Sequence, residues 1–111
     1  MKRVILLSFF LSFSCTSCLI QNPKMEDCEV KEIKVTKVYE GGVKDIVFQE
    51  ADGNFYYINR GLEQGYTLTK FREKVLNKNV TLHLASTLMG SSSNHIAQIA
   101  IGDEILFTEF N

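Results

Sequence analysis

The feature that most restricts the fold of this chain is a single change of hydrophobic period near its middle. Only here do apolar side chains recur with helical spacing, at Leu68, Phe71, Val75 and Leu76. Thr67 is a suitable N-cap residue directly ahead of this stripe. On both sides the chain consists of short runs rich in β-branched and aromatic residues, separated by turns that contain glycine. The pattern therefore predicts a mostly β fold with one helix.

Three strands are predicted before the helix. Residues 29–40 are rich in Val and Ile, but their apolar positions change face within the run, which indicates a bulge or a bend. A Gly-Gly pair then turns the chain into a second strand at 43–50. Asp52 and Gly53 predict a two-residue type I′ hairpin turn that leads to a third strand at 54–59.

Further strands are predicted after the helix. Residues 79–85 alternate between apolar and polar, and residues 90–94 have the composition of a flexible loop. Two more strands, 95–101 and 104–110, are joined at Gly102 and Asp103. The whole order is three strands, one helix, and two or three strands.

This order of elements resembles that of the OB-fold, a small antiparallel β-barrel. In that family a helix between the third and fourth strands plugs one end of the barrel, and residues 67–77 occupy the matching place here. The resemblance is one of element order over residues 29–110. An SH3-like barrel and an open α+β sheet are the alternatives.

The first residues have the composition of an export signal. Lys2 and Arg3 precede an uncharged run at residues 4–13, VILLSFFLSF, which at ten residues is half of the about 20 that a membrane-spanning helix needs. Small residues and two cysteines, Cys15 and Cys18, follow the run. A redox motif would need a helix N-terminus beside a βαβ pattern, but these cysteines follow an apolar run and precede a polar spacer. A zinc site would need a second Cys or His pair at close spacing, which the sequence does not offer.

The arrangement resembles the signal of a bacterial lipoprotein, in which a peptidase cuts before a cysteine whose thiol carries diacylglycerol. The resemblance implies a signal peptide at 1–14 with cleavage before Cys15, or alternatively before Cys18. It implies a lipidated tether at 15–28 and a single domain at 29–111. The resemblance further implies that the membrane is a partner of the mature protein, which its covalent lipid would anchor in the cell envelope, at the outer membrane or the periplasmic face. Plain secretion and a retained membrane anchor are the alternatives.

The charge of the mature chain argues against nucleic acid as a partner. The first 14 residues hold two of the 12 basic and none of the 13 acidic residues, so their removal leaves a net charge near −3. Proteins that bind nucleic acid are usually basic, because phosphate contacts supply most of the affinity. The third cysteine, Cys28, is expected either to pair with Cys18 or to be buried as a small side chain.

The third predicted strand holds the candidate ligand-binding residues. Tyr56 or Tyr57 could offer an aromatic platform on the outer face of the sheet. In the competing interpretation, Phe55 and Tyr57 fill the core and Tyr56 covers an edge. Arg60 follows the strand and could bind a carboxylate or phosphate, or it could form a surface ion pair with Glu63.

No catalytic residue is predicted, because the chain lacks a nucleophile with a placed base, paired carboxylates and a phosphate-binding glycine loop. No cofactor is predicted either. The leading interpretation is a lipid-anchored, non-enzymatic envelope protein that binds a protein partner or a small ligand through its strand face and loops. One alternative is an inhibitor or immunity-type protein whose loop 86–94 blocks an envelope enzyme. Another is a metal-dependent enzyme that uses His83 and His95, which lack a placed third ligand.

Overall fold

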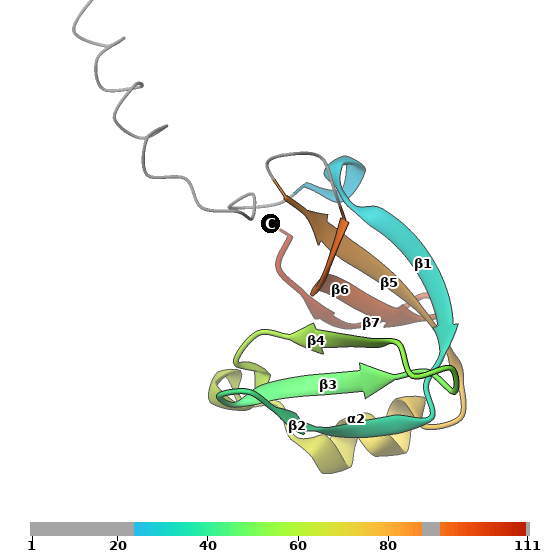
Figure 1. Ribbon diagram of the computed structural model, residues 1–111, viewed down its shortest axis with the longest axis vertical. Coiled ribbons are helices and arrows are strands. Elements are labelled where there is room, and N and C mark those ends of the chain that lie inside the picture. Colours follow the sequence, from blue (N-terminus) through green and yellow to red (C-terminus); the bar gives the residue numbers. More distant parts are fainter. Residues whose placement is uncertain (1–23, 88–91, 111) are drawn as a thin grey trace, which may run out of the picture.

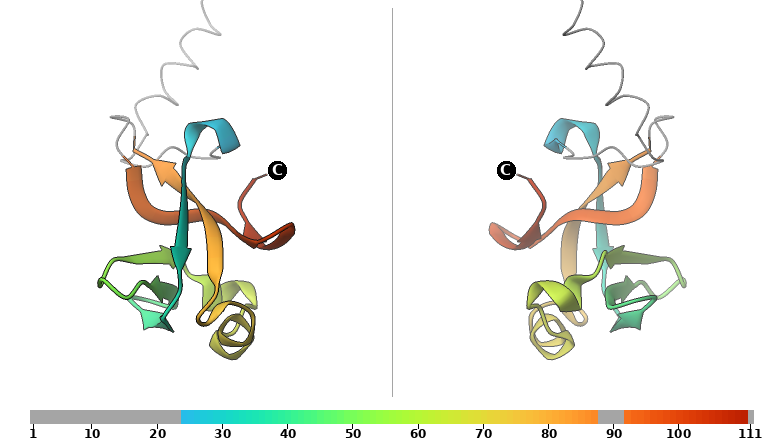
Figure 2. Two further views of the ribbon diagram at one scale, coloured as in Figure 1. Left: turned by 90° about the vertical axis from the view of Figure 1, so that its right-hand side faces the viewer. Right: turned by 90° about the vertical axis from the view of Figure 1, so that its left-hand side faces the viewer.

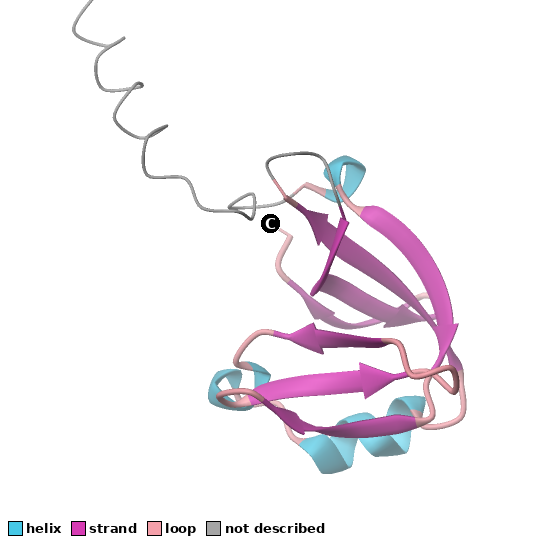
Figure 3. Cartoon of the chain, in the orientation of Figure 1, coloured by secondary structure: helices cyan, strands magenta, loops and turns pink. Residues whose placement is uncertain are grey.

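The computed structural model describes residues 24–87 and 92–110, and it folds them into a strand-rich domain with one α-helix (Figure 1; Figure 3). Two short 3-10 turns, η1 (Met25–Asp27) and η2 (Gly61–Gln64), accompany the helix α2 (Leu68–Val75). The strands are β1 (Glu29–Lys34), β2 (Lys37–Gly41), β3 (Asp45–Gln49), β4 (Phe55–Ile58), β5 (Asn79–Ser86), β6 (Ser92–Ile101) and β7 (Glu104–Thr108). The mostly β class with one helix is therefore confirmed.

The strands form one mixed sheet in the order β1-β5-β6-β4-β3-β2, with β7 paired to β6. Every pair is antiparallel except β4 and β6, which run parallel at Tyr57 and His95. A parallel pair needs a long crossover connection, and η2, α2 and β5 provide it. The expectation of a wholly antiparallel sheet is therefore wrong. Within the described strands no ladder joins β1 to β2, so the sheet is not closed into a barrel.

The first predicted strand is broken into β1 and β2 at Val35 and Thr36. The Val35 N–H donates to the loop ahead of β5, while the Thr36 N–H donates to the Gln49 carbonyl of β3 at 2.8 Å. The backbone thus leaves one neighbour and joins another. Beyond this point Val38 is buried, whereas Val30 on β1 is 59% exposed. The bend predicted from the change of apolar face is confirmed.

Helix α2 lies against one end of the sheet, below β2 and β3 in Figure 1. The predicted N-cap is confirmed, because the Thr67 hydroxyl accepts the Lys70 N–H at 3.2 Å. Phe71 is buried, and its ring centre lies 5.1 Å from that of Phe48 in an edge-on arrangement. The Arg72 Nε–H donates to a carbonyl of β2 at 2.9 Å and so holds the helix against this strand. The core includes Ile33, Val38, Ile46, Phe48, Tyr56, Ile58, Phe71, Val75, Leu82, Leu84, Ile96, Ile99 and Phe107.

The hairpin between β3 and β4 is confirmed, but its turn differs from the expected type. The Gly53 N–H bonds to the Glu50 carbonyl at 3.1 Å, and the Glu50 N–H bonds to the Asn54 carbonyl at 2.9 Å. Within the turn only Gly53 has a positive φ, at 98°, whereas a type I′ turn needs two such residues. The connection is a three-residue loop. This loop sets the register that pairs Phe48 with Tyr56.

The strand β6 begins at Ser92, so part of the predicted flexible loop at 90–94 belongs to the sheet. The Asn94 side-chain amide donates to the Phe55 carbonyl at 2.8 Å and ties β6 to β4. Ser86 of β5 pairs with Ser92 at the start of β6, and its hydroxyl donates to the Asp27 carbonyl of η1 at 2.6 Å. Among the residues with a described structure, no helix is both long and apolar enough to span a bilayer.

Candidate functional site

The outer face of β2, β3 and β4 carries a row of side chains in register. Tyr39 of β2 pairs with Val47 of β3, which pairs with Tyr57 of β4. Paired residues on neighbouring strands point to the same face of a sheet, so these three side chains lie next to one another. Phe55 lies two residues before Tyr57 and therefore on this face too. Tyr39 is 37% exposed and Phe55 is 48% exposed.

These side chains surround a shallow space of about 320 Å³, here called the aromatic hollow. Its lining consists of Tyr39, Gly41, Gly42, Asp45, Val47, Phe55 and Tyr57. Val47 is only 6% exposed although it lies on the outer face, because the larger rings flank it. A Cβ atom at Gly41 would lie 2.6 Å from a methyl group of Val47, so glycine is needed for the close approach of the backbone at this end of the hollow.

The Tyr57 hydroxyl of the hollow is held in its neutral, hydrogen-bonding form. Burial raises the pKa of Tyr57, and the negative charges of Asp45 and Glu109 raise it further. The Tyr39 hydroxyl donates to the Gln49 side-chain oxygen at 3.1 Å. The hollow can therefore offer hydroxyl groups next to aromatic faces.

Arg60 acts at the edge of the hollow through its backbone and not through its guanidinium group. Its N–H donates to the Asp45 carboxylate at 2.8 Å, and its φ of 52° is in the left-handed region. The guanidinium pairs with Glu63 at 3.0 Å, with both side chains about half exposed. The ion-pair interpretation of Arg60 is confirmed. Near the hollow, Arg60 therefore serves to fix the orientation of the Asp45 carboxylate through its backbone N–H.

Tyr56 does not lie on the surface. It is 6% exposed, its ring belongs to the core, and its hydroxyl donates to the Glu50 carboxylate at 3.2 Å. Burial, followed by the bond to Glu50, raises the pKa of Tyr56 to about 12. Of the two residues predicted as a platform, Tyr56 is therefore wrong and Tyr57 is the one on the outer face. The competing interpretation is also wrong, because Tyr56 does not cover an edge and Phe55, at 48% exposed, does not fill the core. The run Phe-Tyr-Tyr is aromatic at every position, so its sequence does not show which residues face inward.

Sequence reasoning missed Tyr39 and Val47 as members of the site. The signal that could have found them is the spacing across the Gly-Gly turn: once Gly41 is paired with Asp45, Tyr39 must face Val47. That pairing can be predicted only if it is known where β2 ends and where β3 begins. Figure 1 shows how closely β2, β3 and β4 lie side by side.

The two histidines contact different residues. The His83 ring lies edge-on to Phe110 with centres 5.7 Å apart, and its Nδ1 atom is buried without a hydrogen-bond partner among the described groups. His95 lies edge-on to Tyr57 at 5.7 Å and bonds the Glu109 carboxylate at 2.9 Å. In residues 24–87 and 92–110, no three His, Cys, Asp or Glu side chains are grouped as metal ligands.

The cysteines are only partly accounted for. Cys15 and Cys18 lie outside the described residues, as do positions 88–91 of the loop 86–94. Cys28 is half-buried, and its thiol lies 3.5 Å from the Lys24 carbonyl. Burial raises the pKa of the Cys28 thiol, and the charges of Asp27 and Glu109 add to this effect.

Comparisons with models of protein families, with curated protein sequences and with solved structures find no match to this chain.

Proposed function

We propose that this protein is a non-enzymatic binding module whose ligand occupies the aromatic hollow. The observation that supports this most is the arrangement of Tyr39, Phe55 and Tyr57 around the buried side chain of Val47. Aromatic rings bind flat apolar groups through their faces and edges at little cost in conformational entropy. Apolar side chains that gather on one part of a surface, unlike single ones, often mark a binding site.

The chemistry of the lining suggests the kind of group that is bound. A volume of about 320 Å³ is at the small end of the range for ligand sites, so the hollow suits one ring-sized group. The Asp45 carboxylate at its edge can accept a hydrogen bond from that group, and the Tyr57 hydroxyl can donate one. The ligand is therefore a small molecule with a flat apolar face and polar substituents, or a partner protein that presents such a group.

The order of the strands supports an OB-like architecture as part of this proposal. The two end strands of the sheet, β1 and β2, are halves of one bent strand. When they are counted as one strand, the helix lies between the third and fourth strands, as the OB-fold requires. In OB-folds the face of the second and third strands binds ligands. Those strands correspond to β3 and β4, which carry Val47, Phe55 and Tyr57.

We also propose that lipid on Cys15 or Cys18 holds the domain at the cell envelope. The support is the signal-like composition of the first 18 residues, which lie outside the described part. Each buried methylene of an acyl chain adds about 0.8 kcal/mol of membrane affinity, so two or three chains give lasting attachment. A short tether would then leave the aromatic hollow free to meet a ligand near the membrane surface.

The binding proposal is tested with purified protein coupled to a resin and exposed to envelope extracts. We expect the unchanged protein and a V30A control to retain the same ligand, and the double variant Y39A/Y57A to lose it. Val30 is exposed on β1, a strand that contributes nothing to the hollow, so it is a suitable control. Retention of one stoichiometric enzyme by all three proteins would contradict the proposal and favour the inhibitor alternative.

The anchor is tested by growing bacteria that express the full chain with a radioactive fatty acid. We expect label in the protein and in one of the single variants C15S and C18S, and no label in the double variant. Label that persists in the double variant would contradict the anchor while leaving the binding proposal intact.

A further inference from the structure

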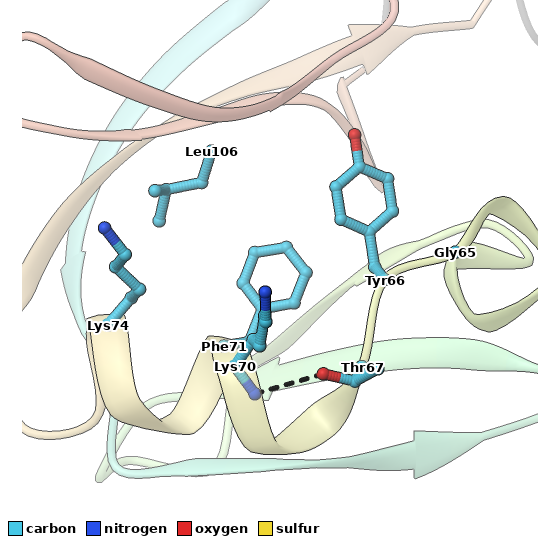
Figure 4. A pocket seen from close by; sticks show the side chains of 7 residues that line it. All are labelled: Gly65, Tyr66, Thr67, Lys70, Phe71, Lys74 and Leu106. Atoms are coloured by element: carbon cyan, nitrogen blue, oxygen red, sulfur yellow. Dashed lines mark hydrogen bonds between the residues drawn. The ribbon is translucent and has the colours of Figure 1, made fainter.

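A second hollow, here called the helix pocket, lies between α2 and β7 (Figure 4). Helix α2 and β7 are on the other side of the molecule from the outer face of β2, β3 and β4, as Figure 2 shows. The helix pocket has a volume of about 290 Å³, and its lining includes Tyr66, Thr67, Lys70, Phe71, Lys74 and Leu106. It shares no lining residue with the aromatic hollow.

The interior of the helix pocket is apolar and held in place by ring packing. The ring of Tyr66 has its centre 5.6 Å from that of Phe71 and 5.5 Å from that of Phe107. Phe71 and Phe107 are both buried, so Tyr66 is fixed as a wall. Leu106 of β7 is half-buried and forms the facing wall, as Figure 4 shows.

The rim of the helix pocket has a net positive charge. Lys70 and Lys74 are one helical turn apart, so they lie on the same face of α2. The Lys74 ammonium pairs with the Glu104 carboxylate of β7 at 2.7 Å, with both side chains about half exposed. No hydrogen bond or ion pair to the Lys70 ammonium is found among the described side chains. Two lysines and one glutamate give the rim a net charge of +1.

We propose that the helix pocket binds a small amphipathic monoanion, namely a carboxylate carried on a short alkyl chain. The chain would lie between Tyr66, Phe71 and Leu106, and the carboxylate would pair with Lys70. Charge complementarity selects this occupant. Among the described residues, the rim has one cation without a partner, Lys70, which attracts an anion, and the interior has no charged group and so accepts an apolar chain. The small volume restricts the chain to a short one.

The proposal is tested by titrating the ¹⁵N-labelled full chain with sodium octanoate and following its amide spectrum. We expect shifts in residues 66–71 and 104–107, with a Kd of about 1 mM for a ligand of this size. Acetate offers the charge without the chain, and octanol offers the chain without the charge. Both are expected to bind more weakly than octanoate.

Two variants with the same change in charge separate the pairing from a general charge effect. Octanoate should bind K70Q about two- to fivefold more weakly, as for the loss of an exposed ion pair. K78Q alters an exposed lysine beyond the end of α2 and should leave the Kd unchanged. Unshifted spectra of the free variants would show that both remain folded.

Three results would overturn the proposal. Equal binding of octanol and octanoate would remove the role of the charge. Unchanged binding by K70Q would remove the role of Lys70. Shifts confined to β2, β3 and β4 would place the octanoate in the aromatic hollow and not in the helix pocket. The first two results do not depend on whether the aromatic hollow binds a ligand.

Discussion

Phe71 is the side chain through which α2 is expected to stabilise the domain most. It is 4% exposed, and its ring contacts those of Phe48 and Tyr66. Truncation of a buried phenylalanine to alanine costs about 3–5 kcal/mol, because the lost transfer free energy is joined by the cost of the cavity. Alanine favours the helix at least as well as phenylalanine, so helix propensity does not contribute to this loss.

The expected change is large in relation to the whole stability of the domain, because proteins of this kind are stable by about 5–15 kcal/mol. Urea unfolding followed by circular dichroism should therefore show a loss of about 3–5 kcal/mol for F71A. The midpoint of thermal unfolding should fall by at least about 12 °C.

Two further variants make the measurement specific to the ring. F71L keeps most of the volume but loses the edge-on contact with Phe48, so it should cost about 1–1.5 kcal/mol. E73A changes an exposed position on the same helix and should stay within about 0.5 kcal/mol of the unchanged protein. A loss below 1 kcal/mol for F71A, or an equal loss for E73A, would refute the placement of α2 against the core.

Three more predictions follow from the contacts described above. Because the pKa of Tyr56 is raised to about 12 from an ordinary value near 10, the folded state holds this proton more tightly, and its stability should fall as pH rises from 10 to 12. The variant Y56F should lack this part of the decline in urea unfolding, and E50Q should lower the pKa of Tyr56 measured by tyrosinate absorbance. In G61A the new Cβ would lie 2.7 Å from a methyl group of the buried Ile46, so the free energy of unfolding should fall by about 1–3 kcal/mol. Loss of the N-cap in T67A should lower it by about 0.5–2 kcal/mol, and T67S should restore most of this difference.

The helix and the bend were predictable because each depends on neighbouring residues. The stripe that contains Phe71 and Val75 has only one helical interpretation, and Thr67 marks where it begins. The break near Val35 is visible because Ile33 and Val38, which are an odd number of residues apart, cannot both face the core from an unbroken strand. In local patterns of this kind, the spacing of the apolar residues itself shows which side chains face the core.

The face of β4 and the shape of the sheet could not be predicted in the same way. A shift of one residue turns every side chain of a strand to the other face, and the run Phe55 to Tyr57 is compatible with both choices. The loop at Gly53 decides between them, because it pairs Phe48 with Tyr56. The parallel contact between β4 and β6 joins Tyr57 to His95, which are far apart in the sequence, so no local pattern signals it.

The division of one strand between two neighbours has a consequence for the order in which the chain folds. Its second half, β2, meets β3 after a short turn, so this hairpin can form as soon as both are made. Its first half, β1, pairs with β5, so Ile33 cannot pair before Val80 has been synthesised. Pairing over such distances along the chain slows folding. The strand that is synthesised first, β1, is thus expected to be completed last, and until then its edge is open to other chains.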